Sequence, residues 1–173
     1  MQANMLDQID HAIRAAATEF VEAVFADGWR GREREAVSLF AIGYLIRQCR
    51  PGSVLHSPTQ IAIEAAVPGV PQLNPKGRVN KDLVIWPQPA QTCWDEAWKV
   101  AHDPLAVLEW KVFRPTTGPP GVSRYDLSWL TRFSRGRPNF VGYAVWLDLA
   151  RRGSRLAAAR VHEGVVEAGW LQL

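Results

Sequence analysis

Two short apolar segments decide the fold of this chain: NKDLVIW at residues 80–86 and LAVLEWKVF at residues 105–113. Each has the length of a β-strand and carries charge where a buried strand carries none. Side chains alternate between the two faces of a strand, so Glu109 and Lys111 share one face and the apolar residues beside them share the other. If the two segments pair, Asp82 lies next to Glu109 and Lys111. A core does not tolerate three such charges without a partner, so we expect this spot to bind a metal ion or a phosphate.

Apolar periodicity predicts the elements that surround these segments. Apolar residues at three- and four-residue steps indicate amphipathic helices over residues 5–26 and 31–48. Alternating apolar residues indicate strands over residues 59–67 and 139–149. Together with the two charged segments, this predicts a sheet with helices packed against it.

A third helix is predicted after the second charged segment. Ser123 and Asp126 have the spacing of a capping box, and the helix is expected to run through Phe133. Cations near a helix C-terminus interact favourably with the helix dipole, but arginines gathered on a surface also contact phosphates, so both interpretations stay open. The arginines concerned are Arg132, Arg135 and Arg137 at the C-terminal end, with Arg124 at the start of the helix.

Two segments are ambiguous in the sequence. Residues 87–104 fit either a short helix or a long hairpin loop. The tail predicts a closing strand, or a hairpin that turns near Glu163 and Gly164. We therefore expect one α/β or α+β domain over residues 1–173.

The second predicted helix carries Glu33 and Glu35 in its first turn. Acidic residues are favourable there because the N-terminus of a helix carries partial positive charge. A functional role for either glutamate depends on what the helix packs against.

The composition is that of a globular protein. The chain has 173 residues, of which 47% are hydrophobic and 21% charged. Its net charge is +3, and 16 of its 20 basic residues are arginine, which binds phosphate through a planar fork of donors. This favours a polyanionic partner. Two cysteines without metal-ligand spacing, no secretory signal and no apolar run of about 18 residues predict a soluble, cytoplasmic protein that does not bind membranes.

Taken together, these features resemble the restriction-endonuclease-like PD-(D/E)XK nuclease superfamily. The resemblance rests on the order helix, strand, strand, strand, helix, strand over about residues 31–149, with an acid at the start of the second strand and Glu-x-Lys in the third. It implies a central mixed β-sheet flanked by helices, to which this chain adds an N-terminal helix.

The resemblance also implies roles for individual residues. Asp82 and Glu109 would hold one or two divalent cations, Mg²⁺ or Mn²⁺, and Lys111 would assist the attacking water. An acid on the helix before the first strand often completes the site. Glu35 fits this position, with Glu33 as the alternative.

The expected activity is hydrolysis of phosphodiester bonds. Mg²⁺ keeps positions for water and a phosphate oxygen, and the backbone carbonyl of Trp110 is its natural third ligand. We therefore expect a metal-dependent nuclease, acting on DNA in repair, restriction or mobile-element defence. Specificity is expected from loops, a homodimer or a partner, because no separate recognition domain is evident. The expected nucleic-acid contacts are Arg124, Arg132, Arg135 and Arg137.

Two departures from the family pattern keep other functions open. Position 81 is lysine where the motif has proline, and Glu109 follows Asp82 by 27 positions, which is a long gap. One alternative is a nucleic-acid-binding or assembly protein that keeps the fold but cleaves nothing. The other is a different α/β protein in which Glu109 and Lys111 form a structural ion pair.

Overall fold

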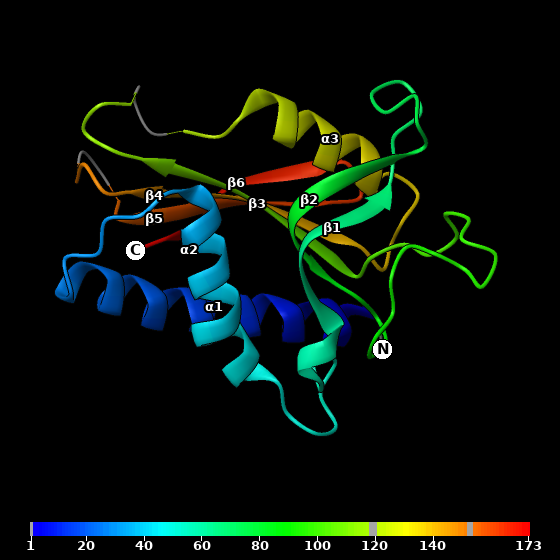
Figure 1. Cartoon of the computed structure of the whole chain (residues 1–173), viewed down its shortest axis with the longest axis horizontal. Helices are drawn as coiled ribbons and strands as arrows, with labels where there is room; N and C mark the ends of the chain where they lie inside the picture. The colour runs from blue at the N-terminus through cyan, green and yellow to red at the C-terminus, as the bar shows by residue number, and fades with distance from the viewer. Residues whose placement is uncertain (1, 118–120, 152–153) are drawn as a thin grey trace.

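One six-stranded mixed β-sheet runs through the molecule (Figure 1). The structure is a computed structural model that describes residues 2–117, 121–151 and 154–173. Helices α1 (Gln2–Ala26) and α2 (Glu33–Phe40) pack on one face of the sheet, and α3 (Arg124–Ser134) packs on the other. The chain is therefore an α/β protein whose sheet is flanked by helices, as the sequence predicted.

The strands lie in the sheet in the order of the sequence. Strands β3 and β4 are parallel and joined by α3, and the other described neighbours are antiparallel. The structure confirms the predicted order of elements: two helices, three strands, a helix and a strand. Strands β5 and β6 then extend the sheet. The bounds are β1 (Ile61–Pro68), β2 (Arg78–Ile85), β3 (Ala106–Phe113), β4 (Val141–Asp148), β5 (Leu156–His162) and β6 (Val165–Gln172).

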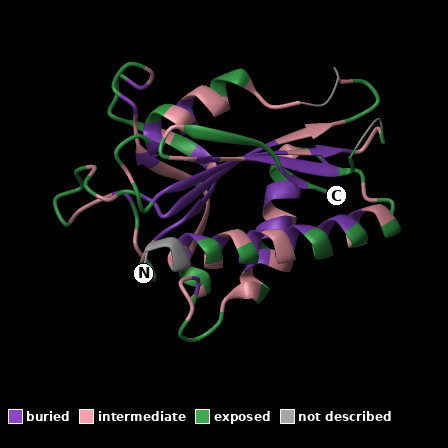
Figure 2. Ribbon diagram, turned by 180° about the vertical axis from the view of Figure 1, so that it is seen from behind, coloured by how far each residue is buried: buried purple, intermediate pink, exposed green. Residues whose placement is uncertain are grey.

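Alternation along β3 separates an apolar face from a charged one, as predicted. Leu108 and Trp110 join the core beneath α1 and α2, while Val107 joins the core beneath α3. The ring of Trp110 lies 5.7 Å from that of Phe20 in α1 and 5.0 Å from that of Phe40 in α2. The middle strands are accordingly buried on both faces (Figure 2). Glu109 and Lys111 face α3.

The second predicted helix, over residues 31–48, is helical but irregular. It begins as α2, continues through a π-helical turn (Ala41–Leu45) and ends in a 3₁₀ turn (Ile46–Gln48). The backbone N–H of Arg32 donates to Glu35 Oε2 at 2.7 Å, so Glu35 caps the start of its own helix.

Strand β2 pairs unequally with its two neighbours. Its residues 78–81 and 83–85 pair with β1, but only residues 83–85 pair with β3, at residues 106–108. The β1–β2 ribbon then turns away from β3 and passes close to α3 (Figure 1). Glu64 lies opposite Asp82 in this ribbon and has a φ of 51°, a strained value for a residue with a side chain. The two strands that carry the predicted catalytic residues therefore separate where those residues begin.

The two ambiguous segments are resolved by the structure. Residues 87–104 form a long loop with a small bridge between Trp94 and Val100. Strands β5 and β6 form the predicted hairpin, and Glu163 and Gly164 at its turn have φ values of 48° and 80°. Positive φ at both positions is the requirement of a tight type I′ turn. Among the described helices, none combines the length and apolar character needed to cross a membrane.

Candidate active site

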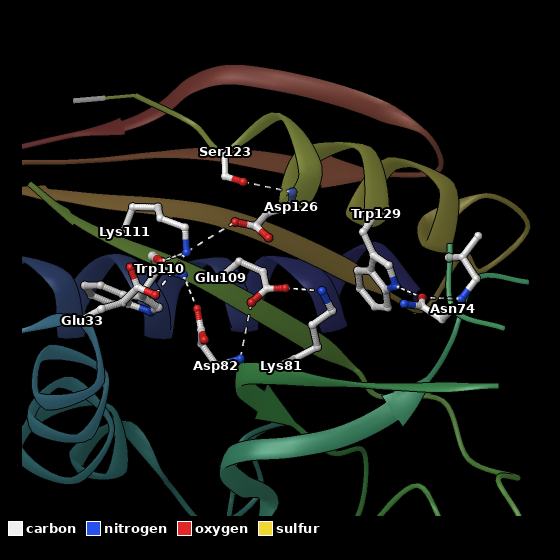
Figure 3. Close-up of polar contacts among 11 residues, drawn as sticks. Glu33, Asn74, Lys81, Asp82, Glu109, Trp110, Lys111, Ser123, Asp126 and Trp129 are labelled. Carbon is white, nitrogen blue, oxygen red and sulfur yellow. Dashed lines mark hydrogen bonds and ion pairs between the residues drawn. The ribbon is translucent and has the colours of Figure 1, made fainter. Parts of the chain in front are cut away.

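Acids and lysines gather where β2 and β3 separate, beneath the first turn of α3 (Figure 3). We call this group the acid–lysine cluster. It draws on α2, β2, β3 and α3, and its described members are Glu33, Lys81, Asp82, Glu109, Lys111 and Asp126. The structure thus brings together Asp82, Glu109 and Lys111, the residues on which the sequence prediction rested.

Crossed hydrogen bonds hold the two predicted metal-binding carboxylates. Asp82 Oδ2 accepts from the backbone N–H of Trp110 at 2.8 Å, and Glu109 Oε2 accepts from the backbone N–H of Asp82 at 3.4 Å. Each side chain therefore bonds to the opposite strand just beyond the last backbone pair. The carboxylates replace the ladder that β2 and β3 no longer make.

Lys81 is a buried member of the cluster that sequence reasoning missed. Its ammonium forms an ion pair with Glu109 Oε1 and lies 3.9 Å from the centre of the Trp129 ring. Both partners are buried, with Lys81 only 2% exposed. The alternative hypothesis of a structural pair between Glu109 and Lys111 is therefore corrected, because Lys81 is the cation that Glu109 contacts. Lys81, which stands where the PD-(D/E)XK motif has proline, is thus the charge partner of Glu109.

Lys111 lies on the more open side of the cluster. Its Nζ donates to the backbone carbonyl of Trp110 at 2.7 Å and to Glu33 Oε1 at 3.1 Å, and it lies 3.6 Å from Asp126 Oδ2. The side chain is 36% exposed, whereas those of Lys81 and Glu109 are buried. Lys111 contacts the carbonyl that was predicted as the third metal ligand.

The glutamate of α2 that reaches the cluster is Glu33, and Glu35 does not. Glu35 was the preferred prediction, but its carboxylate is turned back to the start of α2. Glu33 is in phase with Val37 and Phe40, four and seven residues on, and both are buried against the sheet. That spacing is a signal in the sequence that favours Glu33 over Glu35.

Asp126 is a second residue that the sequence analysis left outside the site. The predicted cap is present, since the backbone N–H of Asp126 donates to Ser123 Oγ at 3.3 Å. The carboxylate of Asp126 itself points toward Lys111 (Figure 3). Its place in the first turn of a helix that follows Glu-x-Lys was the signal that it faces the same region.

The cluster holds an excess of negative charge. Four carboxylates face two ammonium groups among the described residues, which leaves a charge of −2 when all are ionised. Burial raises the pKa of Glu109 to about 7; Lys81 opposes this, and the charges of Asp82 and Asp126 add to it. Burial also raises the pKa of Glu33, against the effect of Lys111. Burial lowers the pKa of Lys111, but Glu33 and Asp126 outweigh this and raise it.

The donor set suits a hard divalent cation. Two carboxylates and a carbonyl, all oxygen donors, match the few protein ligands that Mg²⁺ takes while it keeps water. A dication would also cancel the charge excess. Among the described residues no three acidic, histidine or cysteine side chains converge on one point. The holders would therefore be Asp82, Glu109 and the carbonyl of Trp110, with water at the other positions.

An open cleft reaches the cluster from the side of α2. Its volume is about 320 Å³, and its lining includes Glu33 and Asp82. The ion pair between Arg34 and the strained Glu64 forms part of its wall.

The predicted nucleic-acid-binding arginines lie at the two ends of α3. Arg124 is exposed at the first residue, next to the turn that carries Asp126. Arg132 and Arg135 are exposed at the other end, and Arg137 donates to Asp103 Oδ2 and to the carbonyl of Phe133, both at 2.9 Å. Arg137 therefore binds the carbonyl end of α3, which is the structural role that the sequence left open. Arg132 and Arg135 do not make these contacts.

No model of a protein family, no curated protein and no solved structure matches the chain. The interpretation of the cluster therefore rests on its own geometry and charge.

The raised pKa of Glu109 predicts a pH-dependent stability. The native state binds the Glu109 proton more tightly than the unfolded chain, whose glutamate has the ordinary value of 4.5. Without divalent cations, the free energy of unfolding should fall as pH rises from about 4.5 to about 7, by up to about 3 kcal/mol. Urea unfolding in EDTA across this range measures it. Glu109→Gln should flatten the curve, and Glu35→Gln should leave it intact; parallel curves for wild type and Glu109→Gln would contradict the assignment.

Loss of Lys81 should leave Glu109 buried without its cation. We expect Lys81→Met to lower the free energy of unfolding at pH 8 by about 3–5 kcal/mol, the usual cost of breaking a buried pair. Adding Glu109→Gln should recover most of this loss, because the buried charge is then gone. The exposed Lys99→Met serves as control and should change stability by less than about 0.5 kcal/mol. Additive effects in the double variant would show that the pair is not coupled.

Proposed function

We propose that this chain is a metal-dependent nuclease with a restriction-endonuclease-like core that hydrolyses phosphodiester bonds, most simply those of DNA. The observation that carries the proposal is the convergence of Asp82, Glu109 and Lys111 where β2 and β3 separate. An acid from each strand faces the same opening, and the lysine two residues beyond Glu109 faces it too. A structural ion pair needs one acid and one base, and this cluster has four acids.

The arrangement of the elements supports the same family. Three antiparallel strands follow the helical segment that begins with α2, and α3 then crosses to β4, which is parallel to β3. This is the order that the resemblance implied. The acids lie on the second and third strands, and Glu33 comes from the helix before the first.

The chain's own residues divide the chemistry among them. A bound Mg²⁺ would polarise the phosphoryl oxygen and lower the pKa of water. Asp82 and Glu109 would hold it, and Lys81 keeps one oxygen of Glu109 occupied so that the other faces Asp82. Lys111 can exchange its contact with Glu33 for a phosphate oxygen and stabilise the charge that develops there. Glu33, whose pKa is raised by burial, lies beside Lys111 and could accept a proton from the attacking water.

One observation favours a second candidate, a nucleic-acid-binding protein that does not cleave. Glu109 is only 6% exposed, and both of its oxygens already have partners in Lys81 and the Asp82 amide. A cation would have to compete with these contacts. If it cannot, the same surface binds nucleic acid without hydrolysing it.

Cleavage assays separate the two candidates. Purified protein should nick or degrade DNA with Mg²⁺ or Mn²⁺ and stop in EDTA. Lys111→Ala should reduce turnover by about 10²–10³-fold while metal binding, measured by calorimetry, stays nearly intact, because an ammonium is not a metal ligand. Asp82→Ala should lose both.

Lys99→Ala removes an exposed lysine outside the cluster and should cleave like wild type. DNA binding without cleavage of single-stranded, double-stranded or supercoiled substrates would favour the non-cleaving protein. Cleavage that survives in both Asp82→Ala and Lys111→Ala would place the active site elsewhere.

A further inference from the structure

A cationic site lies at the other end of α3 from the acid–lysine cluster. The C-terminal end of α3 and the loop after β1 enclose a pocket of about 410 Å³, which we call the arginine pocket. None of the described residues that line it is acidic. They are Gly69, Val70, Pro71, Gln72, Arg132, Arg135 and Arg137.

The loop wall of the arginine pocket is fixed to α3. Asn74 Oδ1 accepts from the backbone N–H of Val70 at 3.0 Å and from Trp129 Nε1 at 2.9 Å (Figure 3). Asn74 is only 8% exposed, so these bonds are shielded from water. Gly69 N–H donates to the carbonyl of Gly77 at 2.8 Å and closes the loop. The two walls therefore keep a constant spacing without a ligand.

The three arginines do not have the same surroundings. Arg137 is neutralised by Asp103 and stacks at 4.1 Å from the centre of the Phe133 ring. Arg132 and Arg135 have no acidic partner among the described residues, and both are exposed. The stem of Arg135 passes so close to Gly164 that a Cβ there would lie 2.9 Å from its Cγ. Two exposed arginines thus line one pocket without an acidic partner among the described residues.

We propose that the arginine pocket binds a phosphate group of a nucleic-acid strand, a contact separate from the phosphate attacked at the acid–lysine cluster. This inference rests on the proposed function. Guanidinium groups donate paired hydrogen bonds to phosphate oxygens, and like charges around one pocket are relieved by an anion. Arg132 follows Asp126 by six positions on α3, about 9 Å along the axis at 1.5 Å per residue. The pocket therefore sets where the strand is cut relative to the phosphate that it holds.

Two kinds of phosphate group could occupy the pocket: an internal phosphodiester, or a phosphomonoester at the end of a strand. The first experiment uses inorganic phosphate as the probe. Its titration into labelled protein should shift the Nε–H resonances of Arg132 and Arg135 in NMR spectra and leave that of Arg50, an exposed arginine outside the pocket, unchanged.

The second experiment measures binding of single-stranded oligonucleotides with and without a terminal phosphate, in Ca²⁺ to slow turnover. Arg132→Ala/Arg135→Ala should weaken binding at least about tenfold and lower the slope of the log–log salt dependence by about 0.7 for each lost contact. Arg50→Ala is the control and should bind like wild type. A preference for phosphorylated ends that the double variant loses identifies the terminal phosphate. Equal binding of both oligonucleotides, weakened in the variant, identifies an internal one.

Two results would overturn the arginine pocket: arginine resonances that do not move in phosphate, or a double variant that binds as tightly as Arg50→Ala. Cleavage assays in Mg²⁺ keep this separate from the proposed function. If the wild type cleaves DNA and the double variant binds it unchanged, the phosphate-binding role of the pocket is rejected and the nuclease function is kept. If the arginines bind phosphate but the protein cleaves no DNA, the phosphate-binding role of the pocket is kept and the nuclease function is rejected.

Discussion

The buried ion pair between Lys81 and Glu109 joins three elements at one point. Lys81 comes from β2, Glu109 from β3, and Trp129, whose ring covers the ammonium, from α3. Charges with so little exposure are tolerated only when each has a partner, so the positions of these elements depend on one another. The pair holds β2 near β3 beyond the point where their backbone pairing ends. Because Asp82 follows Lys81 on β2, the same ion pair also holds Asp82 where the two strands separate.

The cluster concentrates more acid than the fold requires. Lys81 accounts for one carboxylate, and Lys111 lies between two others, Glu33 and Asp126. Burial and mutual repulsion then raise the pKa of both Glu33 and Glu109. A chain that needed only stability would lose these charges, because they oppose its folding at neutral pH. The excess is understandable if the site exists to bind a cation and an anion together.

Helix α3 relates the two charged regions of the surface. Its first turn carries Asp126 toward the acid–lysine cluster, and its last turn carries Arg132 to the arginine pocket. Trp129 lies between them, beneath Lys81 on one side and bonded to Asn74 on the other. A rigid helix therefore sets the distance between the acids and the arginines, and the proposed function would use that distance along a phosphate backbone.

The sequence by itself determined the order of the elements and the face that Glu109 and Lys111 share. Both follow from local periodicity, since a strand alternates its side chains whatever it packs against. The start of α3 and the hairpin turn at Glu163 and Gly164 were also predictable, because capping and tight turns depend on neighbouring residues.

Only the tertiary structure decided which residues complete the site. Glu33 and Glu35 share one helical turn. Helical spacing places Glu33 in phase with Val37 and Phe40, but only the packing of those two residues against the sheet brings Glu33 to the cluster. Lys81 alternates with Asp82 and belongs, by period, on the other face with Leu83. Before residue 83 the β1–β2 ribbon turns away from β3, and Lys81 lies over Trp129 instead. Such twists and pairings join residues far apart in the chain, and local periodicity holds no information about them.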